Sequence, residues 1–162
     1  MIKLYHMSKD KFSTGDAIFG TDRDKVDPRI EEAFERFRPT GYLSRREAVF
    51  CRDDADFHRC GIDGGYIYTV SSKNALQVHD LSWLQFPQKA LSKQKYKDPF
   101  PFGMANYPDW NEKLLKDCST SYWSGESTED PVWEYLLPSA IVCEVLSTTI
   151  IDARDTAGGW RD

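Results

Sequence analysis

The chain has 162 residues, of which 40% are hydrophobic and 29% charged, the balance of a soluble globular protein rather than a disordered one. A formal net charge of −5 argues against a general basic surface for nucleic acid, and no apolar run is long enough to span a membrane. The four cysteines include no Cys-x-x-Cys pair, which argues against a zinc knuckle or a disulfide framework. This length supports one sizeable core, so we expect a single domain over residues 1–162.

The first forty residues predict a strand, a loop and a helix. Residues 2–6 alternate between apolar and polar side chains, which predicts a strand with His6 at its end on the apolar face. Residues 13–20 are typical of a loop. The Asp-Pro pair at 27–28 is a helix-start signal, and Pro39 ends the helix that follows.

The next segment predicts a strand followed by a second helix. Residues 41–43 indicate a short strand. Ser44 and Glu47 have the spacing of a capping box, so we expect a helix that starts there and carries Phe50. Residues 66–70 combine aromatic and β-branched side chains and predict a strong strand.

The remaining elements complete a mixed pattern. Residues 78–81 predict a short strand, followed by a helix that Pro87 should disturb. Residues 92–107, rich in lysine and proline, indicate a surface excursion, and a helix should run over 108–119. Residues 140–145 predict another strand. Short strands interrupted by helices indicate an α+β domain.

A single carboxylate, Glu134, lies within the apolar stretch 131–138. On a strand, Glu134 shares a face with Val132 and Leu136, among side chains that favour burial. A buried ionised carboxylate loses hydration, so it is normally paired, hydrogen-bonded or placed on the wall of a ligand cleft. The alternatives to a functional carboxylate are a solvent-facing position on an edge strand and a bridge to an arginine.

Three short segments together resemble a known family. Residues 4–8 (LYHMS), 41–45 (GYLSR) and 133–135 (WEY) are similar to the histidine, aromatic and glutamate motifs of the NAD-dependent ADP-ribosyltransferases, in the branch of diphtheria-type toxins and poly-ADP-ribose polymerases. The resemblance implies a compact split β-sandwich with flanking helices and a cleft for NAD. It implies NAD as co-substrate and no metal.

The resemblance also implies roles for individual residues. Glu134 and His6 would be the catalytic pair, with Glu134 stabilising the positive charge that develops when the nicotinamide bond breaks and His6 binding a ribose hydroxyl of NAD. Met7 stands where the family often has glycine. Tyr42 and Phe50 would hold the nicotinamide ring. The NAD-binding set is His6, Met7, Ser8, Tyr42, Leu43, Ser44, Arg45 and Phe50.

Two of these assignments have competitors in the chain. Arg45 would meet the NAD pyrophosphate near a helix N-terminus, whereas Arg46 is better explained as a solvated surface charge. Glu126 and Glu129 compete with Glu134, because another branch of the superfamily uses two nearby glutamates, but they lie in a polar loop.

The function implied is that of a mono-ADP-ribosyltransferase, which cleaves NAD and transfers ADP-ribose to a macromolecule, protein rather than nucleic acid. A toxin, an injected effector or a phage-borne modifier fits this size, and a toxin would have a neutralising partner protein. An NAD glycohydrolase and a non-catalytic binding or regulatory domain of the same fold stay open as alternatives. We expect a cytoplasmic protein without membrane association, or one delivered into another cell.

Overall fold

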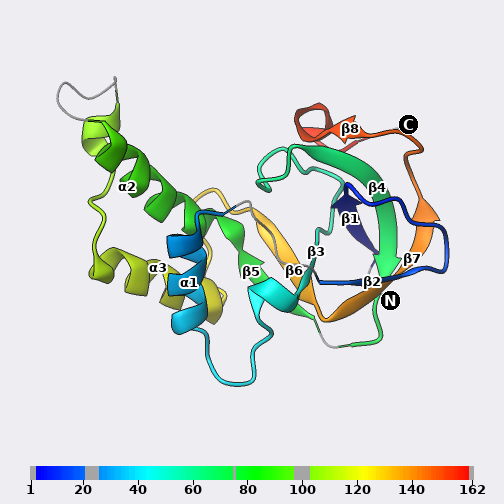
Figure 1. Ribbon diagram of the computed structural model, residues 1–162, viewed down its shortest axis with the longest axis horizontal. Helices are drawn as coiled ribbons and strands as arrows, with labels where there is room; N and C mark the ends of the chain where they lie inside the picture. The colour runs from blue at the N-terminus through cyan, green and yellow to red at the C-terminus, as the bar shows by residue number, and fades with distance from the viewer. Residues whose placement is uncertain (1–2, 21–25, 75, 97–102, 161–162) are drawn as a thin grey trace. The chain divides into compact units, whose positions relative to one another are not determined.

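A computed structural model describes residues 3–20, 26–74, 76–96 and 103–160 of the chain (Figure 1). They form antiparallel β-sheets and a few helices, which confirms the predicted α+β class. The chain divides into two compact units. The first unit comprises residues 1–25, 43–78 and 133–162, and the second unit comprises residues 26–42 and 79–132. The expectation of one domain over residues 1–162 stays a prediction.

The larger sheet belongs to the first unit. Its strands follow the order β1-β4-β7-β2, each antiparallel to its neighbour, and a short strand, β8, pairs with the start of β4. The strands are β1 (Leu4–Ser8), β2 (Ala17–Phe19), β4 (Gly64–Ser71), β7 (Ser139–Val145) and β8 (Ile151–Asp152). The predicted strands at 2–6, 66–70 and 140–145 therefore exist, although Ile2 lies outside the described residues.

A smaller sheet has the order β3-β6-β5, with β6 in the centre. Its strands are β3 (Val49–Cys51), β5 (Gln77–Asp80) and β6 (Trp133–Leu137). β1 meets the chain just after β3 through a pair of backbone hydrogen bonds between Tyr5 and Arg52, of 2.7 and 2.8 Å. This bridge brings the strand that carries His6 next to the sheet that carries Glu134.

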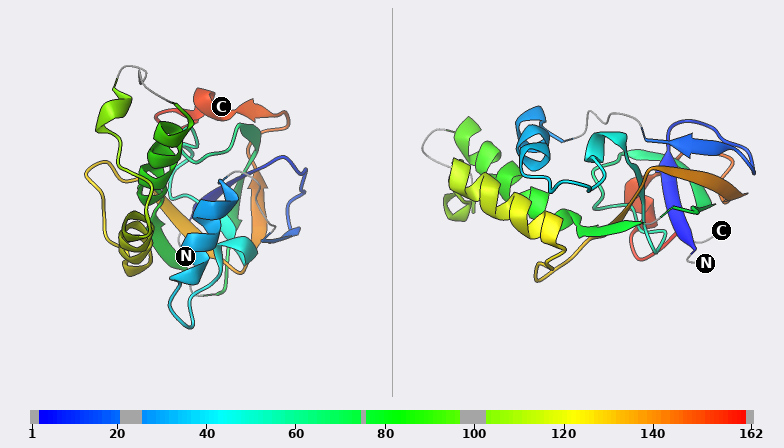
Figure 2. Two further views of the ribbon diagram at one scale, coloured as in Figure 1. Left: turned by 60° about the vertical axis from the view of Figure 1, so that its left-hand side comes forward. Right: turned by 90° about the horizontal axis from the view of Figure 1, so that it is seen from below.

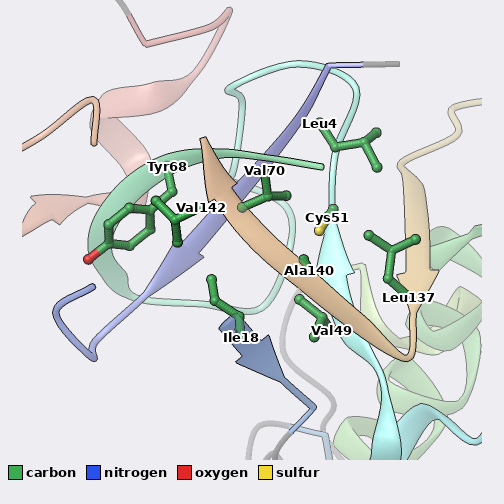
Figure 3. Close-up of a cluster of buried hydrophobic side chains, with 9 residues drawn as sticks. All are labelled: Leu4, Ile18, Val49, Cys51, Tyr68, Val70, Leu137, Ala140 and Val142. Atoms are coloured by element: carbon green, nitrogen blue, oxygen red, sulfur yellow. The ribbon is translucent and has the colours of Figure 1, made fainter. Parts of the chain in front are cut away.

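One hydrophobic core joins the two sheets of the first unit (Figure 3). Strand register places Leu4 opposite Val70 and Val49 opposite Leu137, and side chains from six strands gather there. The buried members are Leu4, Ile18, Val49, Cys51, Tyr68, Val70, Leu137, Ala140 and Val142. Successive side chains on a strand point to opposite faces, so these residues leave the other face of β3 and β6 to Phe50, Glu134 and Leu136.

A second buried cluster lies on the other side of β1. It contains Met7, Ala55, Phe57, Ile67 and Ala153. Because β1 contributes Leu4 to one cluster and Met7 to the other, the strand is covered on both faces. His6 is therefore carried by a buried element that packing holds rigidly.

In the described part of the chain the α-helices all belong to the second unit: α1 (Pro28–Arg36), α2 (Gln85–Lys95) and α3 (Glu112–Ser124). α2 and α3 lie side by side in all views (Figures 1 and 2). The N-caps Asp27 and Asn111 accept hydrogen bonds from the backbone of their own first turns, and Gly125, at φ 78°, ends α3. Trp123 fastens α3 to α1 by donating its indole N–H to the Phe34 carbonyl at 2.7 Å.

Four single 3₁₀ turns complete the described structure: Arg45–Glu47, Leu81–Leu84, Met104–Asn106 and Ala153–Thr156. The first replaces a predicted helix. Ser44 does cap it, accepting from the Arg46 N–H at 3.2 Å, but the chain then becomes β3 because residues 49–51 pair with β6. Strand pairing outweighs the local helix signal here, and the predicted strand at 41–43 is a turn and bend instead.

Three further expectations need correction. Residues 17–19 form strand β2 instead of a loop, since β7 supplies a hydrogen-bonding partner. Pro87 does not disturb a helix, because it lies in the first turn of α2, where backbone N–H groups have no partner within the helix. The helix predicted over 108–119 begins at Glu112 and ends at Ser124, after the cap at Asn111.

Candidate functional site

His6 lies on β1 with 5% of its surface exposed. Its Nδ1 is 2.9 Å from the backbone carbonyl oxygen of Phe50 on β3. A carbonyl oxygen only accepts, so Nδ1 carries the proton, and in the neutral ring Nε2 is the acceptor nitrogen. The histidine thus contacts the main chain of Phe50, two residues before Arg52 of the Tyr5–Arg52 bridge.

Glu134 lies on the central strand β6 and is 4% exposed. Val132 and Leu136, on the same face of the chain, are also buried, as the alternation of the sequence predicted. Phe50 is directly opposite Leu136 in the β3–β6 register, so Phe50 and Glu134 share one face of the small sheet. The edge-strand alternative for Glu134 is wrong, because β6 has a neighbour on either side.

Arg45 reaches Glu134 from the 3₁₀ turn that precedes β3. Its guanidinium forms an ion pair and hydrogen bond with the Glu134 carboxylate, and both side chains are buried. The guanidinium carbon also lies 4.9 Å from the centre of the Phe50 ring, within range of a cation–π interaction. The bridge to an arginine, an alternative that the sequence left open, is therefore present.

The other predicted site residues on β1, and those just before Arg45, make contacts within the fold. Met7 is buried in the second hydrophobic cluster, and the Ser8 hydroxyl accepts a hydrogen bond from the Asp10 N–H at 3.1 Å. Leu43 donates its N–H to Gln77 Oε1 at 3.2 Å. Ser44 is the cap of the turn that carries Arg45. All four positions lie within two residues of His6 or Arg45 in the chain.

Tyr42 belongs to the second unit. Its ring lies edge-on to Trp123, with ring centres 6.0 Å apart, and tilted against His79 at 6.2 Å. The side chain is 38% exposed. Glu126 and Glu129 are also in the second unit, in the exposed loop after α3.

Cys60 is a residue that sequence reasoning did not single out as functional, and the charge of Glu134 acts on its thiol. Burial raises the pKa of its thiol to about 11; the Arg52 guanidinium lowers the pKa, and the negative charge of Glu134 raises it. The group is therefore a neutral thiol at pH 7 and a poor nucleophile. Arg52 itself is held by the Trp133 carbonyl and by Asp54, each at 2.9 Å.

Asp80 is a second buried carboxylate that sequence reasoning missed. It accepts hydrogen bonds from the N–H groups of Ser82, Thr128 and Val132 and from the Thr128 hydroxyl, at 2.7 to 2.9 Å. Burial raises its pKa, but these hydrogen bonds outweigh burial and the pKa is lowered overall. The spacing of Asp80 and Ser82, typical of an N-cap, was the available signal.

The described part of the chain contains no group of three or more histidine, cysteine or acidic side chains that could hold a metal ion. Within the same ranges, every helix is too short or too polar to cross a membrane. Comparison of the chain with protein-family models, with curated proteins and with solved structures gave no match.

Proposed function

We propose that this chain is an NAD-dependent mono-ADP-ribosyltransferase that breaks the bond between nicotinamide and ribose and transfers ADP-ribose to a macromolecule. The observation that carries the proposal is the meeting of His6, Phe50 and Glu134 in the first unit, from strands far apart in the sequence. His6 contacts the Phe50 carbonyl, and Arg45 connects the Phe50 ring with the Glu134 carboxylate.

In this proposal each of the three residues acts on a different part of the bound NAD or of its reaction. Glu134 supplies the negative charge that stabilises the oxocarbenium-like transition state, and it can also hold the 2′-hydroxyl of the reacting ribose. His6 binds a ribose hydroxyl of NAD. Phe50 packs against the nicotinamide ring, and Met7 offers backbone contacts to the amide. None of these steps uses a metal.

The strand connections support the proposed split β-sandwich. Two antiparallel sheets, β1-β4-β7-β2 and β3-β6-β5, meet where Tyr5 bonds to Arg52. We place the ribose and nicotinamide of NAD near this junction, because His6 lies beside it and Phe50 and Glu134 lie on the adjoining sheet.

The proposed acceptor is a protein rather than a nucleic acid, in keeping with the net charge of −5. A cytoplasmic toxin, a delivered effector or a phage-borne modifier is the proposed context, and a toxin would require a neutralising partner. The test is incubation with NAD, measurement of free nicotinamide, and a search for labelled macromolecules in a cell lysate supplied with tagged NAD. Nicotinamide release together with a labelled protein supports the transferase.

One observation favours a second candidate. The Arg45–Glu134 pair is buried, and a buried ion pair can serve the fold without any catalytic role. A non-catalytic binding domain would bind NAD, seen as a rise in melting temperature, and release no nicotinamide. Nicotinamide release without any labelled macromolecule would instead indicate an NAD glycohydrolase.

A further inference from the structure

We infer that Arg45 is a positioning residue that orients the Glu134 carboxylate, and not the residue that binds the pyrophosphate of NAD. This inference rests on the proposed function for its catalytic consequence. It departs from the sequence-based expectation, which assigned Arg45 to the phosphates.

The burial of Arg45 is the first reason. Its surface is 4% exposed, its guanidinium carbon lies 4.9 Å from the centre of the Phe50 ring, and the group bonds to Glu134. A residue that binds a phosphate from solution must present N–H donors to that phosphate. The adjacent Arg46 is exposed, so the same turn carries one buried and one solvent-facing arginine.

The second reason is that the backbone around Arg45 is held by hydrogen bonds within the turn and by close packing against Gly20. Within the turn, the Glu47 N–H donates to the Ser44 carbonyl at 3.1 Å and the Ala48 N–H to the Arg45 carbonyl at 3.4 Å. Gly20, which follows β2, packs so closely on this turn that a Cβ there would lie 2.1 Å from the Glu47 carbonyl oxygen. A fixed turn holds the guanidinium in one place relative to β6.

The chemistry of the carboxylate is the third reason. A carboxylate stabilises a developing positive charge only when it is held in the correct direction, and a charge-assisted hydrogen bond from a planar guanidinium provides such orientation. The positive charge of Arg45 also offsets the desolvation of the carboxylate. The positive charge of Arg45 also repels the positive charge that develops on the ribose. Arg45 therefore contributes by orienting the Glu134 carboxylate and by making its burial possible.

The experiment compares Arg45→Gln and Arg45→Lys with Arg46→Gln as the matched control, and measures nicotinamide release over a range of NAD concentrations. A positioning residue affects kcat and leaves KM unchanged. We expect Arg45→Gln to lower kcat at least about tenfold with KM within about twofold of wild type, Arg45→Lys to recover part of the loss, and Arg46→Gln to match wild type. A rise in KM with unchanged kcat for Arg45→Gln would overturn the inference.

A second measurement decides the inference without activity. Thermal unfolding of Arg45→Gln, Glu134→Gln and the double variant forms a double-mutant cycle. We expect each single replacement to lower the melting temperature by on the order of 10 °C, and the double variant to lose clearly less than the sum. If wild type releases no nicotinamide, the proposed function is wrong. Additive losses in the thermal cycle would refute the pairing of Arg45 with Glu134, whether or not wild type releases nicotinamide. If Arg45→Gln does not fold, Arg45→Lys and the double variant take its place.

Discussion

Among the described residues two carboxylates are buried, Glu134 in the first unit and Asp80 in the second, and they are satisfied in different ways. Asp80 accepts four hydrogen bonds from neutral donors, three of them backbone N–H groups. Glu134 is paired with a charged side chain, Arg45, which also contacts an aromatic ring. Asp80 is thus held by neutral dipoles, whereas Glu134 is held by a charged side chain.

This difference separates a structural carboxylate from a candidate catalytic one. The four donors of Asp80 come from the middle and the end of the segment between α3 and β6 and from the turn after β5, so the carboxylate fastens these chain segments together. Removing the charge of Asp80 leaves neutral groups without an acceptor. Removing the charge of Glu134 leaves a buried cation, which is the more expensive defect.

The largest expected effect is that of Glu134→Gln. It should lower nicotinamide release by about 10² to 10³ fold, which corresponds to about 2.7–4 kcal/mol of transition-state stabilisation. It should also lower the free energy of unfolding by about 3–5 kcal/mol, because the buried Arg45 guanidinium loses the carboxylate charge beside it. Release assays at saturating NAD and urea titrations measure the two effects.

The matched controls for that prediction are Glu126→Gln and Glu129→Gln in the exposed loop. Both should behave like wild type in release and stability. Loss of activity in Glu129→Gln together with near-normal activity in Glu134→Gln would show that Glu134 is not the catalytic carboxylate. The contrast between a catalytic Glu134 and a structural Asp80 would then no longer hold.

Asp80→Asn should have a smaller effect, confined to stability. The amide keeps one oxygen and loses the other, so donors on one side of the group lose their acceptor at a cost of about 1–3 kcal/mol. Chemical denaturation measures the loss, and kcat for nicotinamide release should stay at the wild-type value. A loss of activity without a loss of stability would contradict the structural role of Asp80.

Gly20→Ala disturbs the Arg45 turn without changing any charge. The new methyl group meets the Glu47 carbonyl oxygen, a backbone atom that cannot rotate away, so we expect a loss of about 1–3 kcal/mol in the free energy of unfolding. Because the turn carries Arg45, nicotinamide release should fall as well. Unchanged stability would mean that the turn is free to move and does not fix the guanidinium.

Acid should produce the smallest and most selective effect. The folded-state pKa of Asp80 lies below its ordinary value of 3.8, so its stabilisation is fully present above that pH and is lost as the pH falls through the lower folded pKa. The difference in unfolding free energy between wild type and Asp80→Asn should therefore stay constant from pH 7 to about 4 and shrink below. A difference that is unchanged at pH 2 would show that ionisation of Asp80 contributes nothing.

Local patterns in the sequence predicted several elements and one face correctly. Alternation identified the strand of His6 and the buried face of Glu134, because the side-chain period of a strand is visible in the sequence. The predictions of a helix start at Asp27 and of a strand over 66–70 are confirmed for the same reason, since both depend on residues a few positions apart. The roles of His6, Phe50 and Glu134 stay predictions, because they rest on the resemblance to a family.

Long-range contacts explain where the local patterns failed. Ser44 does cap a turn, but residues 49–51 become a strand because β6, more than 80 positions later, provides hydrogen bonds and a face to pack against. Because the buried Arg45 lies beside Glu134, we expect removal of the Glu134 charge to destabilise the fold.

The sequence by itself determined the α+β class, the strand that carries His6 and the burial of Glu134, because these depend on composition and on short periodic patterns. Only the tertiary structure decided that Arg45 pairs with Glu134 across 89 positions and that four neutral donors surround Asp80. The physical reason is that a buried charge requires a partner, and no local pattern specifies which of many candidates the fold will bring to it.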